Sequence, residues 1–132
     1  MIPHRKRILV VDDSPTSLVW QLVLLQEERY DTLTATTPDE GVRLATEERP
    51  DLVILDSATR PGDMAAAAEA LRADPRTDGI PILVLSPGGL RGRALDALRA
   101  SGDEHVTKPL QGSEYLRKVR DLLARRPAGG LR

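Results

Sequence analysis

Five short apolar runs, separated by segments with helical patterning, constrain the fold of this chain more than any other feature. The runs cover residues 8–11, 33–37, 51–56, 80–86 and 104–107. A run and its following segment repeat roughly every 20–25 residues, which is typical of strand–helix units in a parallel sheet. Three of the runs are almost continuously apolar, as expected for strands that are covered on both faces. The pattern therefore predicts an α/β fold with helices on both sides of the sheet.

Proline and hydroxyl residues mark where the helices begin and end. Ser14-Pro15 and Thr37-Pro38 predict helix starts, because the hydroxyl caps the first turn and proline fits its geometry. Pro50 and Asp74-Pro75 predict helix ends. The predicted helices cover residues 14–28, 37–49, 64–73, 90–100 and 112–126. We expect one domain over residues 1–126 and a flexible tail over residues 127–132.

Composition excludes several classes of protein. The chain has no cysteine, which excludes a disulfide scaffold, a zinc ribbon and a thiol enzyme. Its three aromatic residues, Trp20, Tyr30 and Tyr115, argue against nucleic-acid binding by base stacking. No apolar run approaches the ~18 residues of a membrane span, and no signal-peptide pattern is present. We therefore expect a cytoplasmic protein that does not insert into membranes.

Polar side chains stand at the carboxyl ends of four predicted strands. Asp12 and Asp13 end the first, Asp56 the third and Ser86 the fourth, and Lys108 follows the fifth. Ligands of open parallel sheets bind outside these strand ends, so we expect the five residues to meet at one rim. Clustered carboxylates favour a hard divalent cation, a lysine and a hydroxyl hold phosphoryl oxygens, and an aspartate can form an aspartyl phosphate. The rim predicts a metal-assisted phosphoryl-acceptor site.

Four sequence pieces resemble the receiver domain of two-component response regulators. They are ILVVDD at 8–13, RPDLVILD at 49–56, IPILVLS at 80–86 and GDEHVTKP at 102–109. Each piece alone is weak, but together they occur in the order and at the spacing of the family. The resemblance covers roughly residues 6–124. It implies a CheY-like, flavodoxin-like (βα)5 fold, which is a doubly wound five-stranded parallel sheet of strand order 2-1-3-4-5.

The resemblance also implies roles for individual residues. Asp56 is expected to accept the phosphoryl group, Lys108 to contact it, and Ser86 to move toward it after transfer. The implied ligands of a Mg²⁺ cofactor are Asp12, Asp13, Asp56 and the backbone carbonyl of Ala58. His105 stands where the family usually has a switching Tyr or Phe. The Lys108-Pro109 peptide bond is expected to be cis.

Partners follow from the same resemblance. The phosphoryl donor is expected to be a sensor histidine kinase or a histidine phosphotransfer protein. The receiver is not a conventional enzyme, because it catalyses only its own phosphorylation and dephosphorylation. Its expected output is a population shift of the fourth helix, fifth strand and fifth helix toward a downstream protein or a homodimer. We expect a single-domain response regulator.

Two departures favour an alternative function. Pro61 lies five residues after Asp56 instead of the family's usual four, which predicts a reshaped loop. His105 is smaller and more polar than Tyr or Phe, and its charge can change near neutral pH. Both features favour a pseudo-receiver that keeps the fold and signals through protein contacts without phosphorylation. A flavin or nucleotide binder of the same topology is disfavoured, because carboxylates replace a glycine-rich loop after the first strand.

Small residues flank the two positions closest to the expected phosphoryl group. Ala58 lies two residues after Asp56, and Gly88, within Pro87-Gly88-Gly89, lies two residues after Ser86. The two glycines predict a loose loop, and Pro87 lacks a backbone N–H. We expect water to reach the phosphoryl group easily, so that an Ala58→Asn variant loses it more slowly.

The first predicted helix carries a candidate partner patch. By the family register its buried face includes Trp20, Leu24 and Leu25. Four further apolar side chains then fall largely on the opposite side, namely Leu18, Val19, Leu22 and Val23. They form a candidate docking surface, and a rotated helix that buries part of the patch is the open alternative.

Basic side chains gather on the last two predicted helices. They are Arg91, Arg93, Arg99, Arg117, Lys118, Arg120, Arg125 and Arg126. No helix-turn-helix pattern accompanies them, so direct nucleic-acid binding is not expected. Solvated helix faces or a surface for an acidic partner fit this pattern better.

Overall fold

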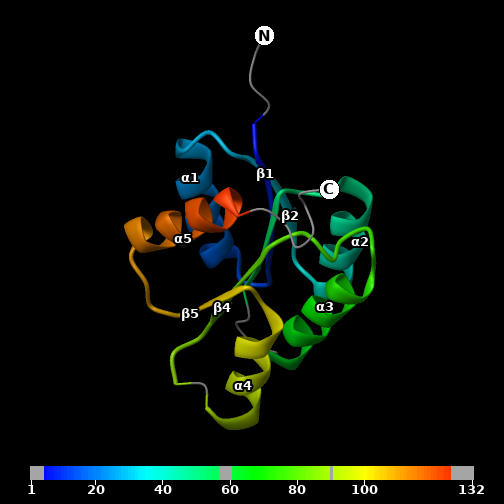
Figure 1. Ribbon diagram of the computed structural model, residues 1–132. Helices are drawn as coiled ribbons and strands as arrows, with labels where there is room; N and C mark the ends of the chain where they lie inside the picture. Colours follow the sequence, from blue (N-terminus) through cyan, green and yellow to red (C-terminus); the bar gives the residue numbers. More distant parts are fainter. Residues whose placement is uncertain (1–4, 57–60, 90, 126–132) are drawn as a thin grey trace.

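The computed structural model describes residues 5–56, 61–89 and 91–125, which form a parallel sheet between two helical layers (Figure 1). The strands are β1 (Arg7–Asp12), β2 (Asp31–Ala35), β3 (Leu52–Asp56), β4 (Ile82–Ser86) and β5 (Glu104–Thr107). The helices are α1 (Pro15–Glu27), α2 (Pro38–Glu48), α3 (Pro61–Ala73), α4 (Gly92–Ser101) and α5 (Gly112–Ala124). All neighbouring strands are parallel, in the order β2-β1-β3-β4-β5. The predicted fold class and strand order are confirmed.

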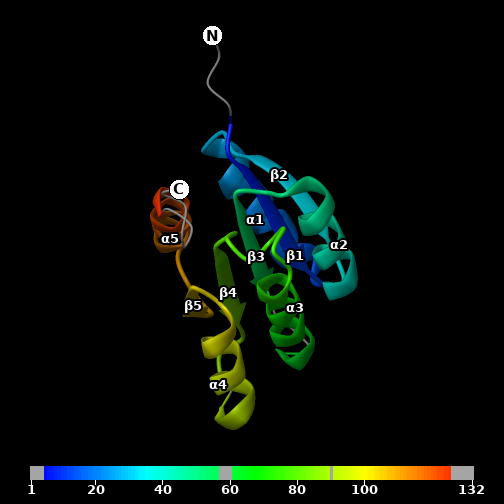
Figure 2. The same cartoon turned by 45° about the vertical axis from the view of Figure 1, so that its right-hand side comes forward.

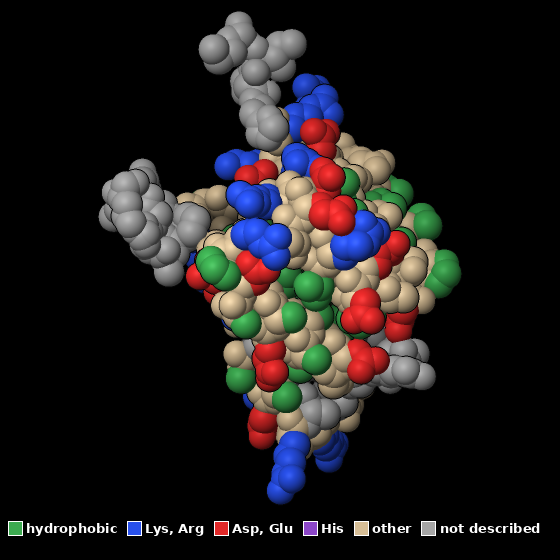
Figure 3. Space-filling view, turned by 90° about the vertical axis from the view of Figure 1, so that its right-hand side faces the viewer, with side chains coloured by type: hydrophobic (Ala, Val, Ile, Leu, Met, Phe, Trp, Pro, Cys, Tyr) green, Lys and Arg blue, Asp and Glu red, His purple; other side chains and the backbone are tan. Residues whose placement is uncertain are grey.

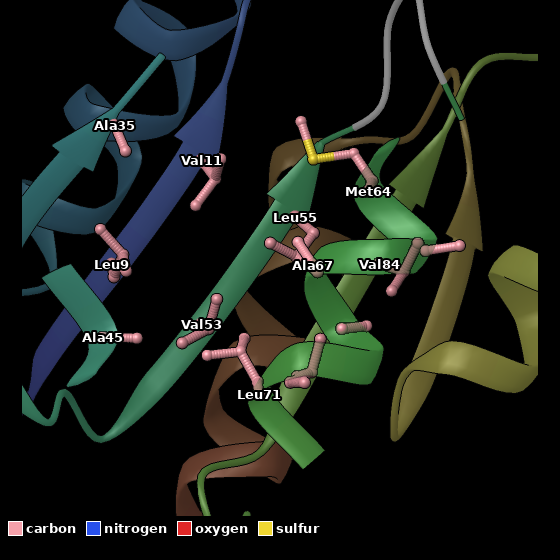
Figure 4. Packing of buried hydrophobic residues seen from close by; sticks show 13 residues of the cluster. Leu9, Val11, Ala35, Ala45, Val53, Leu55, Met64, Ala67, Leu71 and Val84 are labelled. Atoms are coloured by element: carbon pink, nitrogen blue, oxygen red, sulfur yellow. The ribbon is translucent and has the colours of Figure 1, made fainter. Parts of the chain in front are cut away.

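The alternation of side chains along the strands divides the interior into two apolar clusters. Leu9, Val11, Val53 and Leu55 face one side of the sheet, where α2 and α3 cover them (Figure 4). Ile8, Val10, Leu52 and Ile54 face the other side, under α1 and α5. Successive side chains of a strand point to opposite faces, so the continuous apolar runs supply both clusters at once.

The helices form unequal layers. Figures 1 and 2 show α1 and α5 on one side of the sheet and α2 and α3 on the other. The fourth helix packs against α3 and β4, at the end of the second layer. Over α2 and α3, basic and acidic side chains are interspersed with small apolar areas, which is typical of a solvated face (Figure 3).

The predicted helix starts of α1 and α2 are confirmed by their caps. The Ser14 hydroxyl accepts from the backbone N–H of Ser17, and the Thr37 hydroxyl accepts from that of Glu40. The prediction for β2 is displaced by two residues. This strand begins at Asp31, because the backbone N–H of Asp31 already bonds the carbonyl of Lys6.

Other predicted boundaries differ at the helices. The third helix begins at Pro61, three residues before its predicted start, and α5 ends at Ala124. The expected tail over residues 127–132 lies outside the described residues. The expected domain over residues 1–126 stays a prediction.

Candidate functional site

The carboxyl ends of β1 and β3 bring two buried carboxylates side by side. Asp12 and Asp56 are the last residues of these strands and are direct partners in the register. Both residues are fully buried. Ser86 ends β4 and is also buried, and Lys108 directly follows β5. The carboxyl ends of neighbouring parallel strands lie at one edge of the sheet, which places these four residues at the predicted rim.

Lys108 and the first turn of α1 surround Asp56. Lys108 Nζ lies 2.7 Å from Oδ1 of Asp56 and donates to Ser17 Oγ at 3.2 Å. Ser17 Oγ donates to Oδ2 of Asp56 at 3.0 Å. The other oxygen, Oδ1, contacts the Lys108 ammonium at 2.7 Å and has no further hydrogen-bond partner in the described part of the chain. This oxygen keeps lone pairs for a further ligand beside a positive charge.

Gln21 bridges the two carboxylates from the next turn of α1. Its Nε2 donates to Oδ2 of Asp12 and to Oδ2 of Asp56, each at 3.0 Å. Its Oε1 accepts from the Tyr115 hydroxyl at 2.6 Å. Sequence reasoning assigned no site role to Ser17, Gln21 or Tyr115. The available signal was polar residues at 14, 17 and 21, a spacing that places them on one helix face.

The surroundings of Asp56 shift the pKa of its carboxyl group toward neutral pH. Burial, together with the nearby Asp12 carboxylate, raises the pKa of Asp56 to about 6. Lys108 and Ser17 contact the carboxylate and oppose this rise. Strongly perturbed carboxylates in a cleft are typical of functional sites. Asp56 is therefore the strongest candidate for the reactive residue of the rim.

The residues expected to bind magnesium do not all come together in the structure. Among the described side chains, no group of three or more His, Cys, Asp and Glu lies close enough to hold a metal ion. Asp13 is exposed, and Ala58 lies outside the described residues. The buried pair of Asp12 and Asp56 nevertheless fits a hard divalent cation. Magnesium in proteins uses one or two carboxylates together with water and phosphate oxygens.

The predicted switch residues contact each other directly. Ser86 Oγ lies 2.8 Å from Nε2 of His105, at hydrogen-bond distance. Burial and the neighbouring Arg99 lower the pKa of His105, and Glu104 partly opposes them. A lowered pKa keeps the imidazole neutral at pH 7. This contact holds the Ser86 hydroxyl toward β5.

The loop after Ser86 approaches the backbone of Lys108. A Cβ at Gly88 would lie 2.8 Å from the carbonyl oxygen of Lys108. The close approach requires glycine here, and the effect of Gly88 on water access stays a prediction. The Lys108-Pro109 peptide bond is cis, as expected. The loop carrying the predicted insertion before Pro61 includes residues 57–60, which lie outside the described residues.

The predicted register of α1 is wrong for Trp20. Trp20 is 38% exposed, whereas Gln21 and Leu25 are fully buried. Gln21, in place of Trp20, points inward and reaches the carboxylates. Leu25 enters the apolar cluster, as predicted. The predicted patch survives in part: Val19 and Val23 are 59% and 51% exposed. Leu22 is half-buried, and Leu18 packs against the cluster under α1 and α5.

An open cavity of about 660 Å³ lies beside Lys108. It is lined by Ser14, Thr16, Ser17, Trp20, Pro87, Gly88, Lys108, Pro109 and Leu110. Most of this lining is apolar, and Lys108 and Ser17 connect it to Asp56. The cavity thus has a mainly apolar wall close to the Asp56 carboxylate.

Residues 8–120 match the sequence model of the response regulator receiver domain, and the chain belongs to this family. It is 34% identical over 119 residues to the DNA-binding dual master transcriptional regulator RpaA of Synechocystis sp.. That match covers 90% of this chain and 49% of RpaA, so the chain spans about half the length of this relative. It is 29% identical over 118 residues to Protein PilH of Pseudomonas aeruginosa, covering 89% of this chain and 98% of PilH.

A solved receiver domain has the same fold. This domain, from the sensor histidine kinase PA1611 of Pseudomonas aeruginosa PAO1, superposes with a TM-score of 0.83 at 23% identity. The match covers 92% of this chain and all of that domain, which was crystallised with magnesium in its active-site cleft. At this identity the likeness shows the fold alone. Within the described residues of this chain, none of the helices has the length and apolarity needed to cross a membrane.

Proposed function

We propose that this receiver domain is a phosphorylation switch in which Asp56 accepts a phosphoryl group with the help of Mg²⁺. The observation that carries the proposal is the 2.7 Å contact between the Lys108 ammonium and Oδ1 of Asp56, an oxygen with no further hydrogen-bond partner in the described part of the chain. A lysine beside a buried carboxylate offsets the charge that gathers on the transferring phosphoryl group.

The transfer is a displacement at phosphorus. A carboxylate oxygen of Asp56 forms the new O–P bond, and the bond from phosphorus to the donor's leaving group breaks. The leaving group keeps that electron pair. Lys108 and Ser17 contact the carboxylate and orient it. When bound, Mg²⁺ would be held by Asp12, Asp13, Asp56 and the Ala58 carbonyl and would neutralise charge on the phosphoryl oxygens.

The output of the switch uses Ser86 and His105. A phosphoryl group on Asp56 offers oxygens to the Ser86 hydroxyl, which then leaves His105. His105 lies on β5, so its release changes the surface of α4, β5 and α5 toward a downstream protein or a second copy. The donor is a sensor histidine kinase or a phosphotransfer protein, for which the apolar cavity beside Lys108 provides an approach. The cytoplasmic location expected from the sequence stays a prediction.

A pseudo-receiver is the second candidate function. It is favoured by the lack of three converging metal-ligating side chains in the described part of the chain. The Gln21 amide also donates one hydrogen bond to each of the two buried carboxylates. Such a protein would signal through contacts that do not depend on phosphorylation.

Intact mass after incubation with acetyl phosphate and Mg²⁺ tests the proposal. We expect one phosphate adduct on the wild type, lost in Asp56→Asn and when Mg²⁺ is chelated. Asp51→Asn is the matched control, because Asp51 lies just before the other end of β3 and should keep the adduct. A folded wild type that gains no phosphate contradicts the switch and favours the pseudo-receiver.

A further inference from the structure

Gln21 is a buried amide on α1, on the side of the helix that faces the sheet. Its neighbours along that face are Leu18 and Leu25, which both pack in the cluster under α1 and α5. An uncharged polar side chain at such a position is costly unless its groups are hydrogen-bonded. Both N–H groups and the carbonyl of Gln21 have partners. Hydrogen bonds therefore hold both the NH₂ group and the carbonyl oxygen of this amide.

The partners fix which way the amide points. Two carboxylates can only accept, so the NH₂ group must face Asp12 and Asp56. Burial and the two carboxylates raise the pKa of Tyr115 well above its usual value, so the phenol stays protonated. Its hydroxyl donates to Gln21 Oε1. An inverted amide would lose all three hydrogen bonds, and the orientation is unambiguous.

Tyr115 also contacts Trp20, which reaches the surface. Its ring lies 5.2 Å from that of Trp20, at an interplanar angle of 55°. Tyr115 itself is fully buried on α5, whereas Trp20 is partly exposed on α1. The exposed Val19 and Val23 lie on the same helix as Trp20. An unbroken series of contacts thus runs from Asp56 through Gln21 and Tyr115 to the outer face of α1.

We propose that Gln21 positions the Asp56 carboxylate and that the series Asp56–Gln21–Tyr115–Trp20 reports the state of Asp56 to the α1–α5 face. This inference rests on the proposed function and adds a second output to it. When Asp56 is esterified, its negative charge moves to the phosphoryl group and the remaining oxygen becomes a weaker acceptor. The Gln21 amide then loses one of its two anionic partners and shifts, and Tyr115 follows through its short hydrogen bond.

A double-mutant cycle on Asp56 and Tyr115 tests this coupling without any phosphoryl donor. Asp56→Asn removes the charge and keeps the shape, and Tyr115→Phe removes only the hydroxyl. Trp20 is the single tryptophan, so its emission and its indole N–H chemical shift report on one site. We expect Asp56→Asn to change both signals, and Tyr115→Phe to reduce that change about threefold or more. Gln21→Leu is expected to reduce it in the same way.

Tyr30→Phe is the matched control, because Tyr30 packs against the same apolar cluster and the change at Trp20 should remain in full. An equal response to Asp56→Asn with and without the Tyr115→Phe substitution, or no response to Asp56→Asn, overturns the inference. Circular dichroism verifies that each variant is folded. The adduct measurement on the wild type is independent of this cycle. A missing adduct contradicts phosphorylation alone, and a failed cycle contradicts only the relay.

Discussion

The polar residues at the Asp56 end of the sheet belong to two different faces of the sheet. On the α1–α5 face, Asp12 and Asp56 connect to a fully buried polar series through Gln21 and Tyr115. On the opposite face, Ser86 contacts His105, which is only partly buried at the edge strand β5. In the first path, the side chains of Gln21 and Tyr115 are uncharged and fully buried. The other path is short and partly exposed, and it contains an imidazole whose pKa is lowered by burial and by Arg99.

The difference follows from the period of two along a strand. Asp12 and Asp56 are in phase with Val10 and Ile54, which face α1 and α5. Ser86 is in phase with Val84, which faces the other layer. Residues at one rim can therefore contact different helical layers, because Asp56 and Ser86 point to opposite faces of the sheet. A substitution in the Gln21–Tyr115 path is expected to leave the Ser86–His105 contact largely unaffected.

The largest effect is expected from breaking the buried path at Gln21. Gln21→Leu removes the shared donor of two buried carboxylates, so we expect the free energy of unfolding at pH 7 to fall by about 2–4 kcal/mol. Urea denaturation followed by circular dichroism measures it. Gln26→Leu, on the exposed side of α1, should change stability by no more than about 0.5 kcal/mol. If the free energy of unfolding fell equally in the two variants, the hydrogen bonds of Gln21 would contribute nothing specific to stability.

A smaller effect of opposite sign is expected from Asp56→Asn. The pKa of Asp56 is about 6 in the folded protein and 3.8 in its reference state. The ionised carboxylate therefore costs stability above pH 6, a cost that disappears as pH falls toward 4. Without added metal, we expect Asp56→Asn to stabilise the fold by about 1–3 kcal/mol at pH 8 and little at pH 4.

Thermal unfolding across that pH range measures the Asp56 effect. Asp121→Asn, an exposed change on α5, is the matched control and should be neutral throughout. A gain at pH 8 that does not shrink on acidification would contradict burial as its cause.

The smallest effect concerns the partly exposed path. Arg99 lowers the pKa of His105 and Glu104 raises it. Arg99→Ala is therefore expected to raise the pKa of His105, and Glu104→Gln to lower it further. Proton NMR titration in a His4→Asn background, which leaves a single histidine, measures both shifts. Shifts of the same sign in both variants would show that conformational change, not charge, controls this imidazole.

Most of the fold was predictable because its signals are local. Apolar runs indicated the strands, and Ser14 and Thr37 indicated the helix starts that their caps confirm. The rim was predictable as a set of strand ends, since parallel strands bring their carboxyl ends together. The start of β2 was missed by two residues, because its first bond is to Lys6, a partner that is distant in the sequence.

Gln21 could not be assigned from the sequence, because a polar residue on a helix is usually solvated. Its role depends on the rotation of α1, which is fixed by contacts with Asp12, Asp56 and Tyr115 on three other elements. The prediction that Trp20 is buried failed for the same reason. The positions of apolar residues in the family indicate which side of a helix is usually buried. They do not indicate that an amide, here Gln21, occupies a buried position.

The pairing of Asp12 with Asp56 in the β1–β3 ladder has a consequence for how this chain tolerates mutation. Backbone hydrogen bonds fix the register of these two residues, so substitutions on the surrounding helices do not change the face of the sheet to which the two side chains point. An insertion or deletion of a single residue within either strand would instead turn one carboxylate to the opposite face. The shared face of the two carboxylates is thus insensitive to residue type on the helices and sensitive to strand length.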